Sequence, residues 1–269
     1  MKPVLKYPGA KNRIASWIVQ YFPETPHYLE PYFGSGGAFF EKKPSSHEVI
    51  NDCDDRVVNL FTVIRTRGHD LASAIETTPY ARSEYDASYT LTDDPLENAR
   101  RFLVRCWMAH GFVPSRRTGW RHNGSKSLQP VTRLWNDVPD RIRASMARLK
   151  HAEIECFPAL ALIERYATAD TLIYADPPYV LDTRKGKAIY RYEMDDRDHH
   201  HLLDALDAHP GPVVVSGYAN AIYDSCLTHW YRVTKRVSAE KGQIRTEVLW
   251  MNPVCVARLE GVQCLMDFS

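Results

Sequence analysis

The sequence predicts an α/β fold, in which a sheet with helices on both faces carries a mostly helical inserted segment. Short apolar runs alternate with amphipathic helical stretches up to about residue 68 and again from about residue 150. The alternation stops between these two points. A glycine-rich turn and a proline-rich turn each follow directly after an apolar run. We therefore expect one domain built from residues 1–68 and 150–269, interrupted by an inserted domain at residues 69–149.

The first part of the chain contains two expected strands. Residues 27–43 are typical of a short strand, a glycine turn and then a helix. Residues 47–52 indicate a second strand with an acidic end, and residues 55–67 indicate a helix. That helix has apolar residues on one face, at Val57, Leu60, Phe61 and Ile64.

The insertion is expected to be helical, with helices at residues 94–110 and 140–150. Asp94 is placed to cap the first of these, with Pro95 at its first helical position. Alternation then resumes. Strands are expected at residues 152–157, 171–175, 211–218, 231–237 and 246–252, and helices at residues 159–167, 197–209 and 221–227.

Composition is that of a globular protein, with 44% apolar and 25% charged residues. No apolar run approaches the roughly 18 residues of a membrane helix, and the N-terminal segment has no apolar core of a secretory signal. The six cysteines form no C-x-x-C pair. We expect a cytoplasmic protein with reduced thiols and no membrane association.

The net charge of +1 conceals a strong asymmetry. Residues 100–150 contain ten Arg and two Lys against two Asp, which gives +10, and the rest of the chain then carries −9. A solvated helical face is one explanation. The stretch also contains Trp107, Trp120 and Trp135 and the loop SRRTGWRHNGSKS, a composition typical of phosphate and base contacts. A surface for a polyanion is the other explanation.

The glycine turn lies at residues 30–37, Glu-Pro-Tyr-Phe-Gly-Ser-Gly-Gly. Glycines between a strand and the next element let the backbone approach a ligand at the carboxyl end of the strand. The third glycine of the dinucleotide fingerprint is missing, and no Gly-Lys-Ser/Thr follows. Asp52 ends the next strand, where an acid can bind both ribose hydroxyls. Because Glu30 would repel a pyrophosphate, a nucleoside bearing a sulfonium fits better than NAD.

The proline turn is Asp176-Pro177-Pro178-Tyr179, directly after an expected buried strand. Pro178 has no N–H and a fixed φ, and it restricts Pro177 to extended conformations. The Pro177 carbonyl is thereby held in one direction beside the Asp176 carboxylate, and Tyr179 offers a flat face. Two acceptors and a stacking ring suit an exocyclic amine.

These motifs together resemble the Dam-type (D12 class) adenine-N6-specific DNA methyltransferases. The resemblance rests on DPPY after a strand, the glycine turn after Glu-Pro, and KYPGAK at residues 6–11, in the order of that family. It implies the Rossmann-like mixed sheet of the S-adenosyl-L-methionine (AdoMet)-dependent methyltransferase fold, AdoMet as cofactor and double-stranded DNA as partner. It also implies that the insertion at residues 69–149 recognises the target.

The resemblance also implies roles for single residues. Tyr7, Gly9 and Lys11 are expected to line the methionine end of the cofactor site, and Phe157 to lie near the cofactor adenine. Many relatives have Asp directly before this Phe, whereas this chain has Cys156. The other expected cofactor residues are Glu30, Phe33, Gly34, Ser35, Gly36, Asp52 and Asp176.

A mechanism follows from these expectations. An adenine in a duplex must be flipped out to reach an enzyme pocket, and stacking on Tyr179 returns part of the cost. Hydrogen bonds to Asp176 and the Pro177 carbonyl localise the N6 lone pair and stabilise the developing positive charge. The methyl group then transfers directly, without a covalent enzyme intermediate.

DNA contacts are expected from basic residues in two loops, with a flap at residues 181–194 over the DNA. The candidates are Arg116, Arg117, Arg121, Lys126, Arg184 and Lys185. No metal is expected, because the consecutive histidines His199, His200 and His201 point about 100° apart on a helix. We expect a monomer.

Several alternatives stay open. Cytosine-N4 methyltransferases more often have Ser at the position of Asp176, and glutamine methyltransferases usually have Asn, so adenine is favoured. An RNA substrate and a catalytically inactive DNA-binding relative are also consistent with the sequence. An orphan enzyme, a phage-borne enzyme and a member of a restriction-modification system are all consistent with it.

Overall fold

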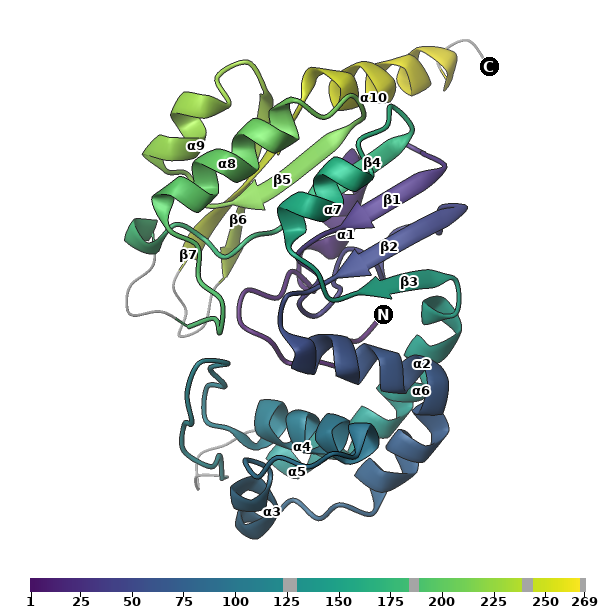
Figure 1. Ribbon diagram of the computed structural model, residues 1–269, viewed down its shortest axis with the longest axis vertical. Helices are drawn as coiled ribbons and strands as arrows, with labels where there is room; N and C mark the ends of the chain where they lie inside the picture. The colour runs from purple at the N-terminus through teal and green to yellow at the C-terminus, as the bar shows by residue number, and fades with distance from the viewer. Residues whose placement is uncertain (123–129, 184–188, 239–243, 267–269) are drawn as a thin grey trace.

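The computed structural model describes residues 1–122, 130–183, 189–238 and 244–266. A sheet with helices on its faces forms the upper body in Figure 1, and a group of helices lies beneath it. The chain leaves the sheet body through α2 (Asp55–Glu76) and returns to it through α6 (Val138–Leu149).

The sheet has seven strands in the order β3-β2-β1-β4-β5-β7-β6. The first five pair in parallel, whereas β7 runs antiparallel to both β5 and β6. The prediction of a mixed α/β sheet is therefore confirmed. The strands are β1 (His27–Glu30), β2 (His47–Asn51), β3 (Ala152–Glu155), β4 (Thr171–Ala175), β5 (Val213–Gly217), β6 (Tyr231–Ser238) and β7 (Ile244–Met251).

Both faces of the sheet are buried, so its central strands are apolar at nearly every position. Ile173 on β4 and Val215 on β5 pack into a cluster with α7 (Ala159–Arg165), α8 (Asp196–Asp207) and α9 (Ala221–Cys226). These three helices lie in front of the sheet in Figure 1. Leu172 and Val214, on the same strands, belong to the opposite cluster, which α1 (Ala15–Ile18), α2 and α10 (Pro253–Met266) help to form.

The helical part consists of α2, α3 (Arg82–Ala87), α4 (Pro95–Met108), α5 (Val131–Asn136) and α6. α2 does not end near residue 67 as expected. It continues through a kink at Arg67 to Glu76. The Asp94 side chain accepts a hydrogen bond from the Leu96 N–H (3.0 Å) at the start of α4, so the predicted cap is confirmed.

Tryptophans in this part of the chain are structural. Trp107 donates from Nε1 to the Val4 carbonyl (2.8 Å), and Trp135 donates to the Thr78 carbonyl (2.9 Å). Both rings are buried. The association of these two tryptophans with base contacts was therefore wrong, because their rings fill the core between the helices and the N-terminal segment.

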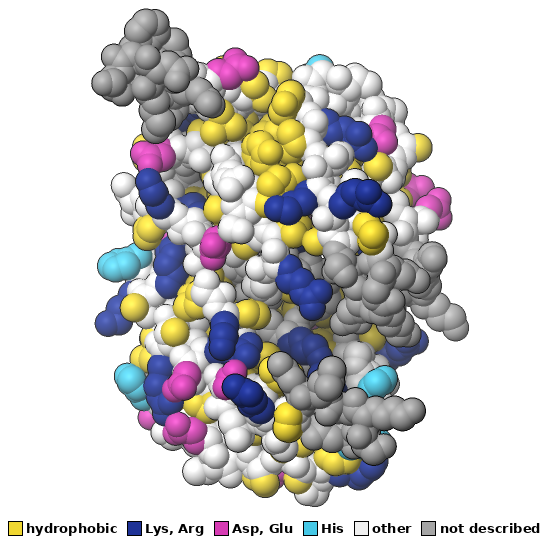
Figure 2. Space-filling view, turned by 180° about the vertical axis from the view of Figure 1, so that it is seen from behind, with side chains coloured by type: hydrophobic (Ala, Val, Ile, Leu, Met, Phe, Trp, Pro, Cys, Tyr) yellow, Lys and Arg dark blue, Asp and Glu magenta, His cyan; other side chains and the backbone are white. Residues whose placement is uncertain are grey.

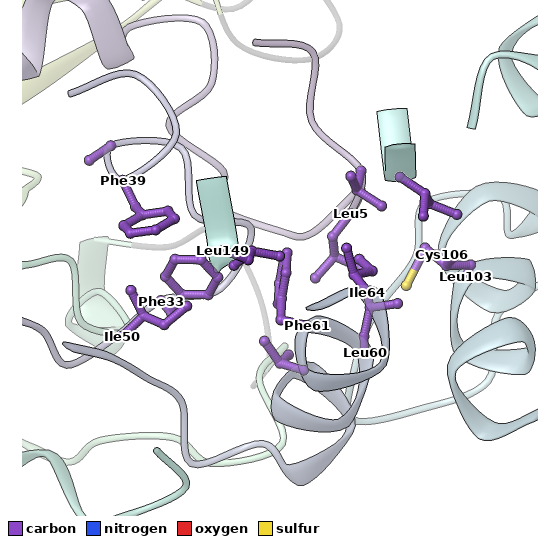
Figure 3. Close-up of a cluster of buried hydrophobic side chains, with 14 of the residues drawn as sticks. Leu5, Phe33, Phe39, Ile50, Leu60, Phe61, Ile64, Leu103, Cys106 and Leu149 are labelled. Atoms are coloured by element: carbon purple, nitrogen blue, oxygen red, sulfur yellow. The ribbon is translucent and has the colours of Figure 1, made fainter. Parts of the chain in front are cut away.

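The helix expected after the glycine turn is absent from residues 31–46. After Gly36 the backbone makes a short run of turns, and Pro44 ends it. Tertiary packing overrides local helix propensity here. Phe33 and Phe39 point into the buried cluster shown in Figure 3, where the Phe33 ring lies edge-on to Phe61 with centroids 4.8 Å apart.

Gly36 cannot take a side chain without strain. Its φ is +67°, and an added Cβ would lie 2.4 Å from Cζ of Phe33 and 2.9 Å from Phe40. We expect Gly36→Ala to lower the free energy of unfolding by about 2–4 kcal/mol, from the left-handed conformation and the overpacking together. Chemical denaturation measures this.

Gly119 provides the matched control for this prediction. An added Cβ there meets nothing within 4 Å, so Gly119→Ala should leave the free energy of unfolding within about 0.5 kcal/mol of the wild-type value. Equal stabilities of the two variants would contradict the packing described for the turn.

The cysteine side chains and the lengths of the helices are relevant to the expected reduced thiols and to membrane association. Cys53, Cys106, Cys156, Cys226 and Cys255 are free thiols. Among the helices of the described ranges, none combines the length and the apolar character needed to cross a membrane.

Candidate active site

The candidate site lies where β1 and β4 stand side by side. From β1 the chain continues outward to β2 and β3, and from β4 it continues to β5 on the other side. Open α/β sheets bind ligands in the crevice at the carboxyl ends of the strands at such a switch point. The glycine turn follows β1 and the proline turn follows β4, so the topology brings the two motifs together.

A cavity opens to solvent at this crevice, between the glycine turn and the proline turn. Its lining includes ten of the residues named as candidates from the sequence. They are Tyr7, Gly9, Lys11, Glu30, Phe33, Gly34, Ser35, Asp52, Asp176 and Pro178.

Asp52 is positioned by backbone hydrogen bonds. It follows β2 directly and accepts from the Gly34 N–H (2.8 Å) and the Asp54 N–H (2.9 Å). The first bond ties the glycine turn to the end of the neighbouring strand. Burial raises the pKa of the Asp52 carboxyl to about 6, against the opposing effect of these two hydrogen bonds. The carboxyl is therefore ionised at neutral pH and protonates in mild acid.

Glu30 lies deeper, at the end of β1, with only 2% of its surface exposed. It accepts a hydrogen bond from the Tyr28 hydroxyl (2.6 Å). Burial raises the pKa of the Glu30 carboxyl to about 8, so this group is largely protonated at neutral pH. A protonated Glu30 can donate or accept a hydrogen bond at the floor of the cavity.

The N-terminal segment forms another wall of the cavity. Gly9 has a φ of +74°, and an added Cβ would lie 2.4 Å from the Tyr190 hydroxyl oxygen. Tyr7 donates to Asp54 (3.4 Å). The close approach of Tyr190 to Gly9 joins the segment after the proline turn to the N-terminal loop.

Asp176 is held by two partners at the end of β4. The Lys11 Nζ lies 2.7 Å from its Oδ1, and the Ser216 hydroxyl donates to the same oxygen (2.8 Å). Tyr179 stands next to this carboxylate. Its hydroxyl donates to Glu247 (2.9 Å), and its ring lies 4.5 Å from the Tyr218 ring, edge to face. Ser216, Tyr218 and Glu247 come from β5, the loop after it and β7, and the sequence did not single them out.

Four of the catalytic and cofactor candidates do not line the cavity: Gly36, Phe157, Pro177 and Tyr179. Phe157 is 42% exposed, and its ring lies 5.1 Å from the Arg165 guanidinium. The Asn51 side chain holds the backbone beside it, since it accepts from the Phe157 N–H (2.8 Å) and donates to the Phe157 carbonyl (3.0 Å). Cys156 is also exposed. Asn51 was not identified from the sequence. It directly precedes Asp52, and a polar residue at the end of a buried strand is the feature by which it could have been found.

The cavity has further lining residues that were not expected there. Asp54 is 1% exposed and binds the Arg56 guanidinium. Tyr190, Arg191 and Tyr192, from the segment expected to form a flap over DNA, line the cavity. Arg191 forms ion pairs with Asp54 (3.4 Å) and with Asp55. This segment therefore closes one side of the cavity.

The same segment also contacts the inserted part of the chain. The Ser115 N–H donates to the Ile189 carbonyl (3.3 Å). Arg56 donates from both terminal nitrogens to the Pro114 carbonyl (3.2 Å each). The loop that carries Arg116 and Arg117 is thus connected to the wall of the cavity.

The basic candidates for nucleic-acid contacts differ in environment. Arg116 and Arg117 are exposed, and Arg121 is half-buried. Arg117 pairs with Asp86 and lies 4.8 Å from the Tyr89 ring. In the part of the chain that the structure describes, neither Arg116 nor Arg121 forms an ion pair. Lys126, Arg184 and Lys185 lie outside the described residues.

Much of the +10 charge of residues 100–150 is balanced in space by acids from other segments. Arg100 pairs with Glu84 (2.8 Å) and Glu97 (2.6 Å), and Arg148 pairs with the buried Glu48. Figure 2 shows Lys and Arg side chains across the middle and lower parts of the face opposite to Figure 1, with Asp and Glu among them in the lower half. The sequence could not separate these structural cations from exposed ones.

The histidine-rich helix α8 has separate partners for its side chains. His199 is buried, with Nδ1 3.1 Å from the Tyr223 hydroxyl, and His200 lies 3.5 Å from the Cys226 sulfur. Among the described residues, no group of three His, Cys, Asp or Glu side chains is arranged to hold a metal ion.

Comparison with known proteins gives a family match over most of the chain. Residues 7–241 match the model of the D12 class N6 adenine-specific DNA methyltransferases. The Type II methyltransferase M.MjaIII of Methanocaldococcus jannaschii is 21% identical, with 88% of this chain and 91% of that protein aligned.

Two other relatives align over a quarter of their own length. The Type II methyltransferase M1.LlaDCHI of Lactococcus lactis is 31% identical over 26% of this chain and 25% of that protein. The DNA N-6-adenine-methyltransferase of Escherichia phage P1 is 24% identical over 66% of this chain and 24% of that protein.

Solved structures resemble the chain only weakly. The protein yhhF of Escherichia coli, described as a methyltransferase, aligns with a TM-score of 0.36 at 10% identity, over 92% of this chain and 91% of that one. A Pyrococcus horikoshii protein described as an RNA methyltransferase aligns with a TM-score of 0.39 at 8% identity, over 92% and 84%. At such scores neither alignment bears on function.

Proposed function

The chain belongs to the D12 class N6 adenine-specific DNA methyltransferase family, and we propose that it transfers a methyl group from AdoMet directly to N6 of an adenine flipped out of duplex DNA. The observation that carries this proposal is that the glycine turn and the proline turn border the same crevice. The Asp176 carboxylate and the Asp52–Gly34 turn border one cavity, although they come from strands far apart in the sequence.

The cavity between Tyr7 and Asp52 is the proposed cofactor site. Bound there, AdoMet supplies an electrophilic methyl group on a sulfonium. Asp52 can accept hydrogen bonds from ribose hydroxyls, because an ionised carboxylate has more acceptor sites than its two backbone donors use. Glu30, Gly34 and Ser35 would surround the rest of the ligand, and Gly34 has a positive φ, a backbone conformation that glycine adopts without strain.

The proposed acceptors for the target amine are the Asp176 carboxylate and the Pro177 carbonyl. Ser216 and Lys11 fix the orientation of the carboxylate. Two acceptors draw the amine out of conjugation with the ring and stabilise the positive charge that develops on N6 during transfer. N6 becomes cationic as it gains the methyl group, and it then releases one proton to solvent. Atoms and charge balance without a nucleophilic cysteine, and Cys53 and Cys106 both have a pKa that burial raises, which disfavours the thiolate.

Tyr179 is the proposed stacking platform for the flipped adenine. Its ring is fixed at two points, by the hydroxyl bond to Glu247 and by the edge-to-face contact with Tyr218. A fixed ring loses little conformational freedom when the base arrives. Stacking returns about 1–3 kcal/mol of the few kcal/mol that base flipping costs.

Residues 69–149 are the proposed target-recognition domain, and residues 1–68 and 150–269 are the proposed AdoMet-binding domain. Arg116 and Arg121 support the first assignment best, because neither forms an ion pair with another described residue. The contact between Ser115 and Ile189 connects this DNA-facing loop to the cavity.

The substrate class is tested by incubating the protein with AdoMet carrying a labelled methyl group and with duplex DNA, single-stranded DNA or RNA of matched sequence. We expect label in duplex DNA. Label in RNA alone would contradict the proposal and assign the activity to an RNA amino-methyltransferase. AdoMet binding without transfer to any of the three would indicate an inactive relative.

The cofactor affinity should depend on pH through Asp52. The pKa of its carboxyl is raised to about 6, so the ionised form that accepts ribose hydroxyls is lost as the pH falls through this value. Between pH 7 and pH 5 we expect the Kd for AdoMet to rise about tenfold, as the ionised fraction falls from about nine tenths to about one tenth. Isothermal titration calorimetry measures this change.

Asp52→Asn is the control for that pH dependence. The amide keeps the size of the side chain but does not titrate, so the Kd of this variant should be nearly constant over the same interval. A wild-type Kd that does not change between pH 7 and pH 5 would contradict the role of Asp52 in holding the cofactor.

Arg116→Ala should weaken DNA binding evenly across sequences if Arg116 contacts phosphate. We expect the slope of log Kd against log salt concentration to change by about 0.9 for this one phosphate contact, as measured by fluorescence anisotropy. Lys43→Ala is the control. Lys43 is highly exposed but pairs with Glu24 on the sheet body, so its loss should leave the slope unchanged.

A further inference from the structure

A second, open pocket lies at the same edge of the sheet as the proposed active site. It forms where three segments meet: the chain after the proline turn, the loop after β5 and the first residues of β7. Because β7 runs antiparallel to β5, its start lies beside the chain that leaves β5. One apolar side chain from each segment lines the pocket, namely Val180, Ile222 and Ile244.

Tyr218 connects this pocket to the proposed base site. Its ring lines the second pocket and also packs edge to face on the Tyr179 ring, with the two centroids 4.5 Å apart. Tyr179 is the proposed stacking platform for the target adenine, beside the Asp176 carboxylate. The second pocket is thus one aromatic ring away from the proposed position of the target base.

Arg245 supplies the positive charge of the second pocket. It is half-buried, it donates from Nη1 to the Tyr218 hydroxyl (3.0 Å), and its guanidinium lies 5.5 Å from the centroid of the Tyr218 ring. Within the described ranges Arg245 forms no ion pair. A guanidinium has five N–H donors, so most of those of Arg245 are available to a ligand in the pocket.

The donors of the pocket fit an oxygen anion. The planar fork of a guanidinium matches the oxygens of a phosphate group. The Tyr218 hydroxyl accepts from Arg245, and it can therefore donate its own hydrogen to the same anion. Two acids, Asp182 and Asp196, also border the pocket. They would repel a run of phosphates, so the charge balance fits one phosphate with an uncharged sugar beside it.

We propose that this pocket binds one backbone phosphate of the target strand, next to the flipped adenine, through the Arg245 guanidinium and the Tyr218 hydroxyl. This inference rests on the proposed function and deepens it, because it assigns a DNA-backbone site to the sheet body, outside the insertion at residues 69–149. A phosphate fixed at Arg245 holds the strand in place while its base stacks on Tyr179.

The experiment uses duplexes in which a single phosphate near the methylated adenine is replaced by a neutral methylphosphonate, after that adenine has been located. At one position we expect kcat/KM of the wild type to fall about 10- to 150-fold, the usual effect of losing a hydrogen bond to a charged group. Arg245→Gln should show a similar loss on unmodified DNA, and almost no further loss when the same phosphate is made neutral.

A purely structural role of Arg245 gives a different pattern. If Arg245 only held the Tyr218 ring in place, the substitution and the neutral phosphate would act independently, and their effects on kcat/KM would multiply at every position. That outcome overturns the proposal. Arg232→Gln is the matched control and should behave as the wild type, because Arg232 lies on the neighbouring β6 but pairs with Asp224 (3.6 Å). Arg245→Met serves as the second variant if Arg245→Gln does not fold, with the same result expected.

A binding measurement that does not depend on activity separates this inference from the proposed function. Single-stranded oligodeoxyadenylate offers an unpaired adenine beside every phosphate, so it requires neither a known target sequence nor base flipping. By fluorescence anisotropy, Arg245→Gln should change the slope of log Kd against log salt concentration by about 0.7, the value for one phosphate of a single strand, and Arg232→Gln should leave it unchanged. This change in a protein that methylates no DNA would leave the phosphate site standing and refute the proposed function; an unchanged slope in a protein that methylates adenine would refute the phosphate site.

Discussion

Asp176→Ala is expected to lower the rate of methyl transfer by about 10²- to 10³-fold, the usual effect of removing one preorganised group that stabilises transition-state charge. In the structure Asp176 is the carboxylate at the end of β4 that accepts from Ser216 and pairs with Lys11. Its removal takes away a proposed acceptor for the target amine. Single-turnover kinetics on duplex DNA, with saturating AdoMet, measure the loss in the transfer step itself.

Two comparisons make this result specific. Asp204→Ala removes an exposed aspartate on α8, outside the cavity, and should keep the wild-type rate. The Kd of Asp176→Ala for duplex DNA should stay close to the wild-type value, because Asp176 is proposed to contact the flipped base and not the phosphate backbone. A variant that lost DNA binding while its transfer rate stayed normal would contradict the assignment of Asp176 to chemistry.

Tyr179→Ala is expected to lower kcat/KM for DNA by about 5- to 150-fold, which corresponds to the loss of about 1–3 kcal/mol of base stacking. The ring is positioned beside Asp176 and packs edge to face on Tyr218. Duplex DNA with 2-aminopurine at the target adenine should also show a smaller rise in fluorescence with this variant, because a base without a stacking partner is flipped out less often.

Tyr179→Phe separates the ring from its hydroxyl. The ring remains, so stacking and most of the fluorescence rise should remain, and the cost should be a few-fold at most. The hydroxyl bond to the buried Glu247 is lost, which should lower stability by about 1–3 kcal/mol. Equal loss of activity in the Phe and Ala variants would show that activity depends on the hydroxyl group and not on stacking by the ring.

The framework of the site could be predicted from the sequence because its signals are local. A polar or glycine-containing motif directly after an apolar run marks the carboxyl end of a strand, and Gly34, Asp52 and Asp176 all lie at such ends. The chain then needs only parallel pairing of β1, β2 and β4 to bring the three together. The pattern of strands alternating with helices predicts parallel pairing, and β1 and β2 pair in parallel although the connection between them contains no helix.

Residues that depend on distant contacts could not be predicted in this way. The basic and aromatic residues around Tyr190 and Arg191 are typical of a DNA-facing flap, but the pattern does not predict that the same residues contact the cavity. In the structure Arg191 pairs with Asp54 and Asp55 and so lies at the cavity. No local pattern connects a loop with acids more than 130 residues earlier in the chain.

The sequence also could not show which cations of the insertion are exposed, because their partners lie in distant parts of the chain. Counting residues gives +10 for residues 100–150, but the count treats every arginine as exposed. Arg148 reaches Glu48 on β2, and its guanidinium lies 3.7 Å from the Phe39 ring. Arg100 is enclosed by Glu84 and Glu97. Only the fold separates these structural cations from Arg116, which remains exposed.

The central claim is that one crevice brings a cofactor cavity and the Asp176 carboxylate together to methylate adenine at N6. Its most direct test is mass spectrometry of the nucleosides released from duplex DNA after incubation with the wild-type protein and AdoMet, with Asp176→Ala in parallel. The account predicts N6-methyldeoxyadenosine with the wild type and almost none with the variant. A methyl group on N4 of cytosine, or equal N6 methylation by both proteins, would contradict it.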